Sequence, residues 1–248
     1  PRLMAQARRQ LTPDTAYLVL TATSGDTGSA AMRGFADIDG FSVLVYYPSA
    51  GISQVQQAQM MRMPGANLAA IGIRGNFDDA QAAVKTAFLQ GEALTGKRLA
   101  LSSANSINIG RLIPQVVYYI KACQELRDKK ALLPGQAVDF IVPTGNFGDI
   151  LAGYLAKRLG CPIGRLVCAS NANRVLTDFL QTGLYDKNRQ LVQTLSPSMD
   201  ILISSNLERL LYYALEEDTQ QVNSLMADLR QQGRYQLDKK PLEYIQEH

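Results

Sequence analysis

The chain reads VDFIVPTGNFGD from Val138 to Asp149, an apolar run followed by a short loop of glycine and polar residues. The apolar run is typical of a buried strand, and a helical pattern begins near Gly148. A loop at such a junction presents the unpaired backbone N–H groups and the positive dipole end of the helix, which favour an anion. The stretch therefore predicts a strand-loop-helix unit that binds phosphate or carboxylate. The alternative is a tight turn in which Gly145 and Asn146 supply positive φ and Asp149 caps the helix.

A second loop, TSGDTG from residues 23 to 28, follows the apolar run Tyr17–Leu20. Ser24 and Thr27 offer hydroxyl groups, while the two glycines let a ligand approach the backbone closely. The pattern is neither the GxGxxG of dinucleotide-binding proteins nor the GK[ST] of a P-loop, and it also fits a plain turn with a Ser or Asp cap. Together the two loops predict a protein that holds a phosphorylated ligand and an anionic partner.

Apolar runs alternate with helical patterns along the chain. The predicted strands are 17–21, 41–47, 67–73, 137–142 and 165–169, and the predicted helices are 28–35, 53–63, 77–89, 107–126 and 148–159. This alternation predicts an α/β fold with open, mostly parallel sheets and helices on both faces, and ligands at the carboxyl ends of the strands. Glycines in 90–97 suggest a smaller, mobile domain over 1–96 and a larger domain over 97–248. Residues 206–248 read as helical and polar.

The composition excludes several function classes. The chain has 25 basic and 22 acidic residues, scattered, which argues against nucleic acid as a partner. No apolar run approaches the ~20 residues of a membrane span, and the first residues lack a signal peptide. Three cysteines without CxxC spacing favour reduced thiols in a cytoplasmic protein. Because the chain does not begin with Met, we expect that it starts inside a longer one.

The histidine content limits the chemistry further. His248 at the end of the chain is the one histidine in the sequence. Ser-His and Cys-His nucleophile systems and histidine-based metal sites therefore have no suitable residue, and no metal site is expected. Chemistry in this chain must rest on a cofactor, carboxylates, lysines or backbone dipoles.

A third polar segment, SSANSINIGR, runs from Ser102 to Arg111. Serine and asparagine are ordinary caps at a helix start. The segment has more of them than capping requires, and Arg111 follows one helical turn later. Asn108 and Arg111, three residues apart, would share a helix face, and an arginine beside hydroxyl and amide groups suits a second phosphate.

These three segments in this order resemble threonine synthase, a pyridoxal-phosphate enzyme of the tryptophan-synthase-β-like fold. The resemblance extends from about Leu3 to at least Leu211. It depends on residues 20–28, on Asn105–Asn108 with Arg111, on residues 142–149, and on Ser196-Pro197-Ser198-Met199-Asp200. The resemblance implies the pyridoxal-phosphate fold type II and pyridoxal 5'-phosphate as cofactor.

The resemblance also implies an activity and a set of site residues. The family converts O-phosphohomoserine and water to threonine and phosphate. By resemblance, the cofactor phosphate is bound by Thr144, Gly145, Asn146, Phe147 and Gly148, and the substrate by Ser24, Gly25, Asp26, Thr27, Asn105, Ser106 and Arg111. The alternatives are a serine or threonine dehydratase-like lyase, against which the cluster with Arg111 argues, and a non-catalytic phospholigand-binding relative. The oligomeric state stays open.

One element of the family pattern is not in this sequence. In the family, the Schiff-base lysine belongs to a Phe-Lys-Asp motif shortly before the segment that matches Arg2–Gln6. We therefore expect this lysine upstream of Pro1 and no catalytic residue within the chain. The resemblance implies a central portion of threonine synthase that cannot perform the full reaction alone.

Overall fold

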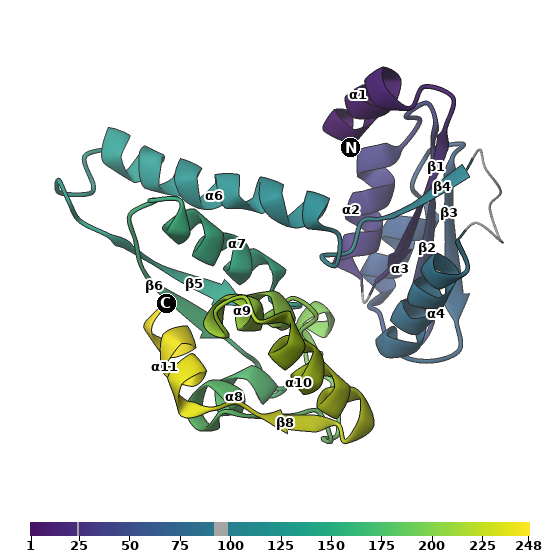
Figure 1. Ribbon diagram of the computed structural model, residues 1–248. Helices are drawn as coiled ribbons and strands as arrows, with labels where there is room; N and C mark the ends of the chain where they lie inside the picture. Colours follow the sequence, from purple (N-terminus) through teal and green to yellow (C-terminus); the bar gives the residue numbers. More distant parts are fainter. Residues whose placement is uncertain (24, 92–98) are drawn as a thin grey trace. The chain divides into compact units, whose positions relative to one another are not determined.

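Parallel strands form the centre of the first of two compact units, which runs from Pro1 to Asn108 (Figure 1). The computed structural model describes residues 1–23, 25–91 and 99–248, and the second unit runs from Ile109 to His248. The sheet of the first unit has the order β3-β2-β1-β4, and each neighbouring pair is parallel. Its strands are β1 (Ala16–Ala22), β2 (Phe41–Pro48), β3 (Leu68–Ile73) and β4 (Leu99–Ser103). The predicted α/β class is confirmed, and β4 is a strand that the sequence pattern did not predict.

Helices cover both faces of this sheet. Successive side chains of a strand point to opposite faces. Val19 and Val43 pack into a cluster with Met32 of α2 and Met60 of α3, whereas Leu20 packs with α4 on the other face. The helices of this unit are α1 (Arg2–Leu11), α2 (Asp26–Phe35), α3 (Gln54–Met61) and α4 (Phe77–Leu89).

Local sequence explains where two of these helices begin. Ser53 accepts a hydrogen bond from the N–H of Gln56, and the Gln56 side chain accepts one in return from the N–H of Ser53. Asn76 and Asp79 form the same reciprocal pair before α4. These capping boxes satisfy N–H groups that the helix itself leaves unpaired.

The second unit is built around a parallel strand pair with helices packed on it. Strands β5 (Val138–Pro143) and β6 (Ile163–Ala169) pair in parallel. Leu151, Phe179 and Leu211, each less than 2% exposed, lie at the centre of its core. The other elements are α6 (Ile109–Asp128), α7 (Gly148–Arg158), α8 (Val175–Thr182), β7 (Leu184–Asp186), η1 (Pro197–Met199), α9 (Leu207–Ala214), α10 (Thr219–Gln231), β8 (Arg234–Gln236) and α11 (Lys239–Glu247).

Two details of the second unit differ from the sequence prediction. Residues 206–248 are not helical throughout, because β8 interrupts them and pairs with β7 in antiparallel fashion. Helix α6 begins at Ile109 rather than at residue 107, and it continues through Pro114. Pro114 is the sixth residue of α6 and lies beyond the first turn, so its ring removes one N–H group that would otherwise donate within the helix.

The division between the units falls after Asn108, and the predicted boundary at residue 96 lies outside the described residues. The reason is strand β4, which pairs with β1 and thereby belongs to the first unit. No helix within the described ranges has both the length and the apolar character needed to cross a membrane.

Candidate functional site

The loop Thr144–Gly148 joins β5 to α7 through a tight turn. The N–H of Thr144 donates to the carbonyl of Ala169 on β6 (2.8 Å), and the N–H of Phe147 donates to the carbonyl of Thr144 (2.8 Å). Gly145 has φ +40° and Phe147 has φ +62°. A left-handed conformation costs a non-glycine residue of order 1–3 kcal/mol. Phe147 keeps it because its ring is buried in the core, so positive φ falls on a residue that the sequence pattern did not single out.

Several N–H groups at this loop are available to a ligand. Among the described residues, no group accepts a hydrogen bond from the N–H of Gly145 or of Asn146. No side chain caps α7, so the N–H groups of its first turn add to this set. The interpretation of Asp149 as a capping residue is therefore wrong. The loop has the features of an anion site at a helix N-terminus.

A segment far along the chain supports the loop. The Ser204 hydroxyl donates to the carbonyl of Gly145 (3.2 Å), and Asn206 donates to the carbonyl of Asn146 through both its N–H (3.1 Å) and its Nδ2 (3.0 Å). Asn206 has no exposed surface. These bonds turn the two carbonyl groups toward residues 204–206. Sequence reasoning missed this segment, and its one signal was the polar run Ser204-Ser205-Asn206 directly before a helix.

The family-like segment 196–200 also lies against the loop. A Cβ atom at Gly145 would lie 3.6 Å from Cε of Met199. The Asp200 carboxylate accepts hydrogen bonds from Nδ2 of Asn171 (2.8 Å), Nδ2 of Asn173 (3.1 Å), and both the N–H (2.8 Å) and the hydroxyl (2.7 Å) of Thr194. Asp200 therefore links the residues after β6 to the segment that carries Met199.

Three buried polar atoms around the start of α7 have no hydrogen-bond partner in the described structure. They are Oδ1 of Asn146, Oδ1 of Asp149 and Oγ of Ser205. An unpaired buried polar group costs about 1–3 kcal/mol, so such a cluster indicates a site completed by a ligand. The hydroxyl of Ser205 can donate to an anion, and the Asn146 amide can do so after a half-turn about its last bond.

The charge balance near the loop is set by Asp149 and Arg111, which lie in the same unit. Burial raises the pKa of Asp149, while a hydrogen bond from Tyr119 and the charge of Arg111 oppose that rise. Burial lowers the pKa of Arg111, and Tyr118 and Asp149 oppose that change. The guanidinium thus offsets a carboxylate that would otherwise repel an anion at the start of α7.

In the first unit, the loop 23–28 is closed by one side chain. Oγ1 of Thr23 accepts hydrogen bonds from the N–H groups of Gly25 (2.9 Å) and Gly28 (3.0 Å). The Asp26 carboxylate accepts one from Nε2 of Gln56 (2.9 Å). The predicted substrate residue Ser24 lies outside the described residues, while Thr27 follows Asp26 in the first turn of α2.

Asn105 connects this loop to the end of β4. Its Oδ1 accepts from the N–H of Ala22 (3.0 Å), and its Nδ2 donates to the carbonyl of the same residue (2.6 Å). Ala22 ends β1 directly before the loop, so the structure brings the predicted residues Gly25–Thr27 and Asn105 to the carboxyl ends of adjacent strands. Ser106, which is 8% exposed, follows Asn105 in the chain.

The prediction that Asn108 and Arg111 share a helix face is wrong. Helix α6 begins at Ile109, so Asn108 precedes it, and Nδ2 of Asn108 donates to the carbonyl of Ser103 (2.8 Å). Arg111 lies in the first turn of α6 and belongs to the second unit with the loop 144–148.

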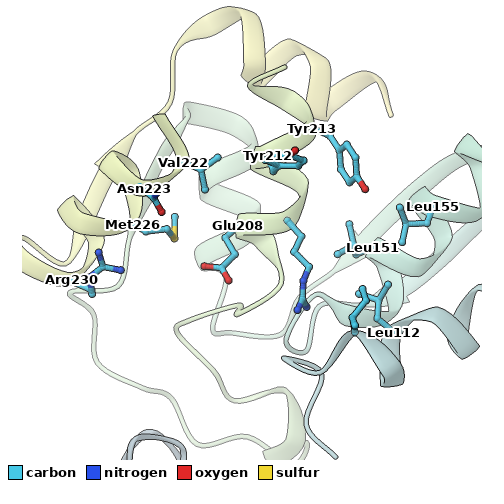
Figure 2. A pocket seen from close by; sticks show the side chains of 12 residues that line it. Leu112, Leu151, Leu155, Glu208, Tyr212, Tyr213, Val222, Asn223, Met226 and Arg230 are labelled. Carbon is cyan, nitrogen blue, oxygen red and sulfur yellow. The ribbon is translucent and has the colours of Figure 1, made fainter. Parts of the chain in front are cut away.

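A cavity of about 480 Å³ in the second unit contains none of the predicted site residues (Figure 2). Leu112 and Leu151 contribute apolar surface, and Glu208 and Arg230 contribute charge. It is lined by Ile109, Leu112, Leu151, Leu155, Glu208, Arg209, Tyr212, Tyr213, Val222, Asn223, Met226 and Arg230. Across the ranges that the structure describes, no group of three or more His, Cys, Asp or Glu residues is arranged to hold a metal ion.

Comparison with known proteins agrees with the interpretation that the loops bind anions. The family described as "Pyridoxal-phosphate dependent enzyme" matches residues 2–228. Human threonine synthase-like 1 is 44% identical over 95% of this chain and 33% of its own length, and yeast threonine synthase is 41% identical over 91% of this chain and 45% of its own length. The crystal structure of a PLP-bound threonine synthase from Brucella melitensis superposes with a TM-score of 0.84 at 43% identity. That match covers all of this chain and 51% of the other.

The fold and the loops define an α/β protein with an anion site at a helix N-terminus. The chain belongs to the pyridoxal-phosphate dependent enzyme family, and its fold is that of the fold type II members. It spans a third to about half of the length of the relatives named above. Their names favour the threonine synthase prediction over a dehydratase-like lyase. The loop 144–148, with its free N–H groups and unpartnered buried atoms, fits a phosphate group of the family's cofactor.

Proposed function

We propose that this chain forms part of a threonine synthase, which converts O-phosphohomoserine and water to threonine and phosphate with pyridoxal 5'-phosphate as cofactor. The observation that carries the proposal is the match of the entire chain to the Brucella melitensis enzyme at 43% identity. A small-molecule substrate with a phosphate group agrees with a chain that has anion-type loops in each of its units.

In this proposal the second unit binds the cofactor phosphate. Within the predicted loop Thr144–Gly148, the N–H groups of Gly145 and Asn146, with those of the first turn of α7, bind the phosphate, and the α7 dipole favours the negative charge. Bound cofactor supplies an electron-withdrawing ring that stabilises negative charge on substrate carbon atoms. The chain's own part is to hold the phosphate in place and so to orient the ring.

The substrate is bound by the other predicted residues. Gly25, Asp26 and Thr27, with Ser24 in the same loop, hold its carboxylate or phosphate, and Asn105, Ser106 and Arg111 contact its phosphate. Asn105 also keeps β1 and β4 in register through Ala22, so its amide has a structural task beside the proposed one. Arg111 adds positive charge where burial strengthens its attraction for an anion.

The test begins with cofactor binding to the chain. Pyridoxal phosphate is titrated into the protein while its visible absorption is recorded, and pyridoxal without the phosphate serves as the control. We expect saturable binding of the phosphorylated form and at least tenfold weaker binding of pyridoxal, because the loop recognises phosphate. O-Phosphohomoserine is then compared with homoserine and with serine by calorimetry, and the phosphorylated compound should bind more tightly.

Two outcomes would argue against the proposal, and a third would argue only against the expected position of the Schiff-base lysine. If pyridoxal and pyridoxal phosphate bind with equal affinity, the loop 144–148 does not bind the cofactor phosphate. Preference for serine over O-phosphohomoserine would favour the dehydratase-like alternative. A borohydride-stable mass increase on one lysine, or threonine formation by the chain alone, would contradict the expectation that the Schiff-base lysine lies upstream of Pro1.

The cellular location and the domain roles are also proposals. Cys123, Cys161 and Cys168 are free thiols, which agrees with a reducing, cytoplasmic setting. We assign cofactor-phosphate binding to the larger, second unit. The smaller first unit contributes substrate contacts.

A further inference from the structure

The hydroxyl group of Ser205 is buried and has no hydrogen-bond partner within the described structure. A serine hydroxyl is both a donor and an acceptor, and nearly all buried hydroxyls in folded proteins use at least one of these capacities. Burying it without a partner costs free energy, because the hydroxyl gives up its hydrogen bonds to water. The Ser205 hydroxyl is therefore available to donate to a bound molecule.

The position of Ser205 indicates what that molecule is. Ser204 on one side donates to the carbonyl of Gly145, and Asn206 on the other side donates to the carbonyl of Asn146. Consecutive Cα atoms are about 3.8 Å apart, so Ser205 lies beside the same two peptide groups. The carbonyls of Gly145 and Asn146 point to residues 204 and 206, and in the described structure no group accepts a hydrogen bond from the N–H of Gly145 or of Asn146.

We propose that Ser205 is a phosphate ligand of this chain, whose Oγ–H donates to an oxygen of a phosphate monoester bound at Gly145 and Asn146. The inference rests on the proposed function and adds a residue that the loop pattern does not include. A hydroxyl donor suits this position because it brings no charge, and Asp149 with Arg111 already balances the local charge. A hydrogen bond to a charged acceptor is about twice as strong as one between neutral groups.

Two neighbouring serines provide a matched test in the full chain. Ser205→Ala removes a hydroxyl that has no partner in the ligand-free protein, so its melting temperature should stay the same or rise. Ser204→Ala removes a donor to Gly145, so its melting temperature should fall by roughly 2–4 °C. For ligand affinity we expect the reverse order: Ser205→Ala should weaken pyridoxal phosphate binding more than Ser204→Ala does. Absorption titration with pyridoxal phosphate measures both affinities directly.

We expect Ser205→Ala to weaken pyridoxal phosphate binding about tenfold while leaving the much weaker binding of pyridoxal unchanged. Ser205→Thr keeps the hydroxyl and should restore most of the lost affinity. Inorganic phosphate, used as a competitor, should displace the cofactor less effectively from Ser205→Ala than from the unmodified chain.

Each other result overturns the inference in a recognisable way. If the unmodified chain binds pyridoxal phosphate and Ser205→Ala binds it equally well, Ser205 is not a ligand, although the proposed function stands. If Ser205→Ala weakens the binding of pyridoxal and of pyridoxal phosphate to the same degree, Ser205 does not act in phosphate binding. If the unmodified chain binds neither pyridoxal phosphate nor inorganic phosphate, the proposed function fails together with the inference.

Discussion

Single residues in the first loop are set by packing as much as by any ligand. Gly28 lies in the first turn of α2, and a Cβ atom there would lie 2.7 Å from Sδ of Met60, 2.7 Å from Cγ2 of Thr23 and 2.8 Å from Cγ1 of Val45. These atoms belong to the core or to the side chain that closes the loop. The sequence pattern attributes this glycine to ligand approach, whereas the structure adds a packing reason for it.

We predict that Gly28→Ala lowers the free energy of unfolding by about 1–3 kcal/mol, because overpacking outweighs the gain in helix propensity. Urea unfolding followed by circular dichroism measures the change. Gly34→Ala in the same helix is the control, since the three atoms nearest to its Cβ belong to the ring of Pro1 and not to the core around Met60. An equal loss in both variants would show that the helix, and not the contact with Met60, is responsible.

At the scale of elements, the loop 144–148 depends on segments that lie 50 or more residues further along the chain. Asp200 organises this support, since its carboxylate collects donors from Asn171, Asn173 and Thr194. Each donor comes from an irregular segment between strands and helices. Irregular segments have few backbone partners of their own, so one carboxylate can determine how several of them pack.

Asp200→Ala should lower the free energy of unfolding by about 2–3 kcal/mol, because it leaves several part-buried donors unpaired. Amide hydrogen exchange should also become faster at Gly145 and Asn146, since Met199 loses its anchor. Asp186→Ala is the matched control: Asp186 accepts from the N–H of Asn188 in an exposed turn, and its loss should cost less than about 1 kcal/mol. Unchanged exchange at the loop in Asp200→Ala would contradict this coupling.

For the whole molecule, we expect stability at alkaline pH to depend on two thiols, the buried Cys123 and the partly buried Cys168. Burial raises the pKa of Cys168 to about 12, and burial together with the Cys161 thiol raises the pKa of Cys123 to about 11. An unfolded thiol has a pKa of about 8.5. Below that pH both states hold the proton, and above it only the unfolded state releases it, so the folded state loses relative stability as pH rises.

We predict that unfolding free energy falls between pH 7.5 and pH 9.5 in the unmodified chain, and that Cys168→Ala removes about 1 kcal/mol of this fall. The comparison uses the pH slope of each protein, so the cavity left by the shorter side chain does not affect it. Urea titrations at four pH values with reductant present provide the slopes. Parallel slopes for the two proteins would show that Cys168 ionises equally in both states.

The α/β class, most strand and helix positions, and the two glycine loops at the carboxyl ends of strands could be predicted from the residues alone. Those features follow from local periodicity and from residues with special backbone preferences, which act over a few neighbours. The order of the motifs was sufficient to indicate the family, which the comparisons confirm. Strand β4 escaped prediction because its small and polar residues owe their extended form to pairing with β1.

The groups that surround the loop 144–148 are known only from the folded chain. Ser204 and Asn206 reach it through hydrogen bonds that span about 60 residues, and no local pattern encodes such contacts. The same applies to Phe147, whose left-handed backbone persists because its ring is buried, and to Asp149, which lies beside Arg111 rather than at a cap. Backbone conformational preferences depend on neighbouring residues, whereas burial and unsatisfied hydrogen bonds arise only when distant segments pack together.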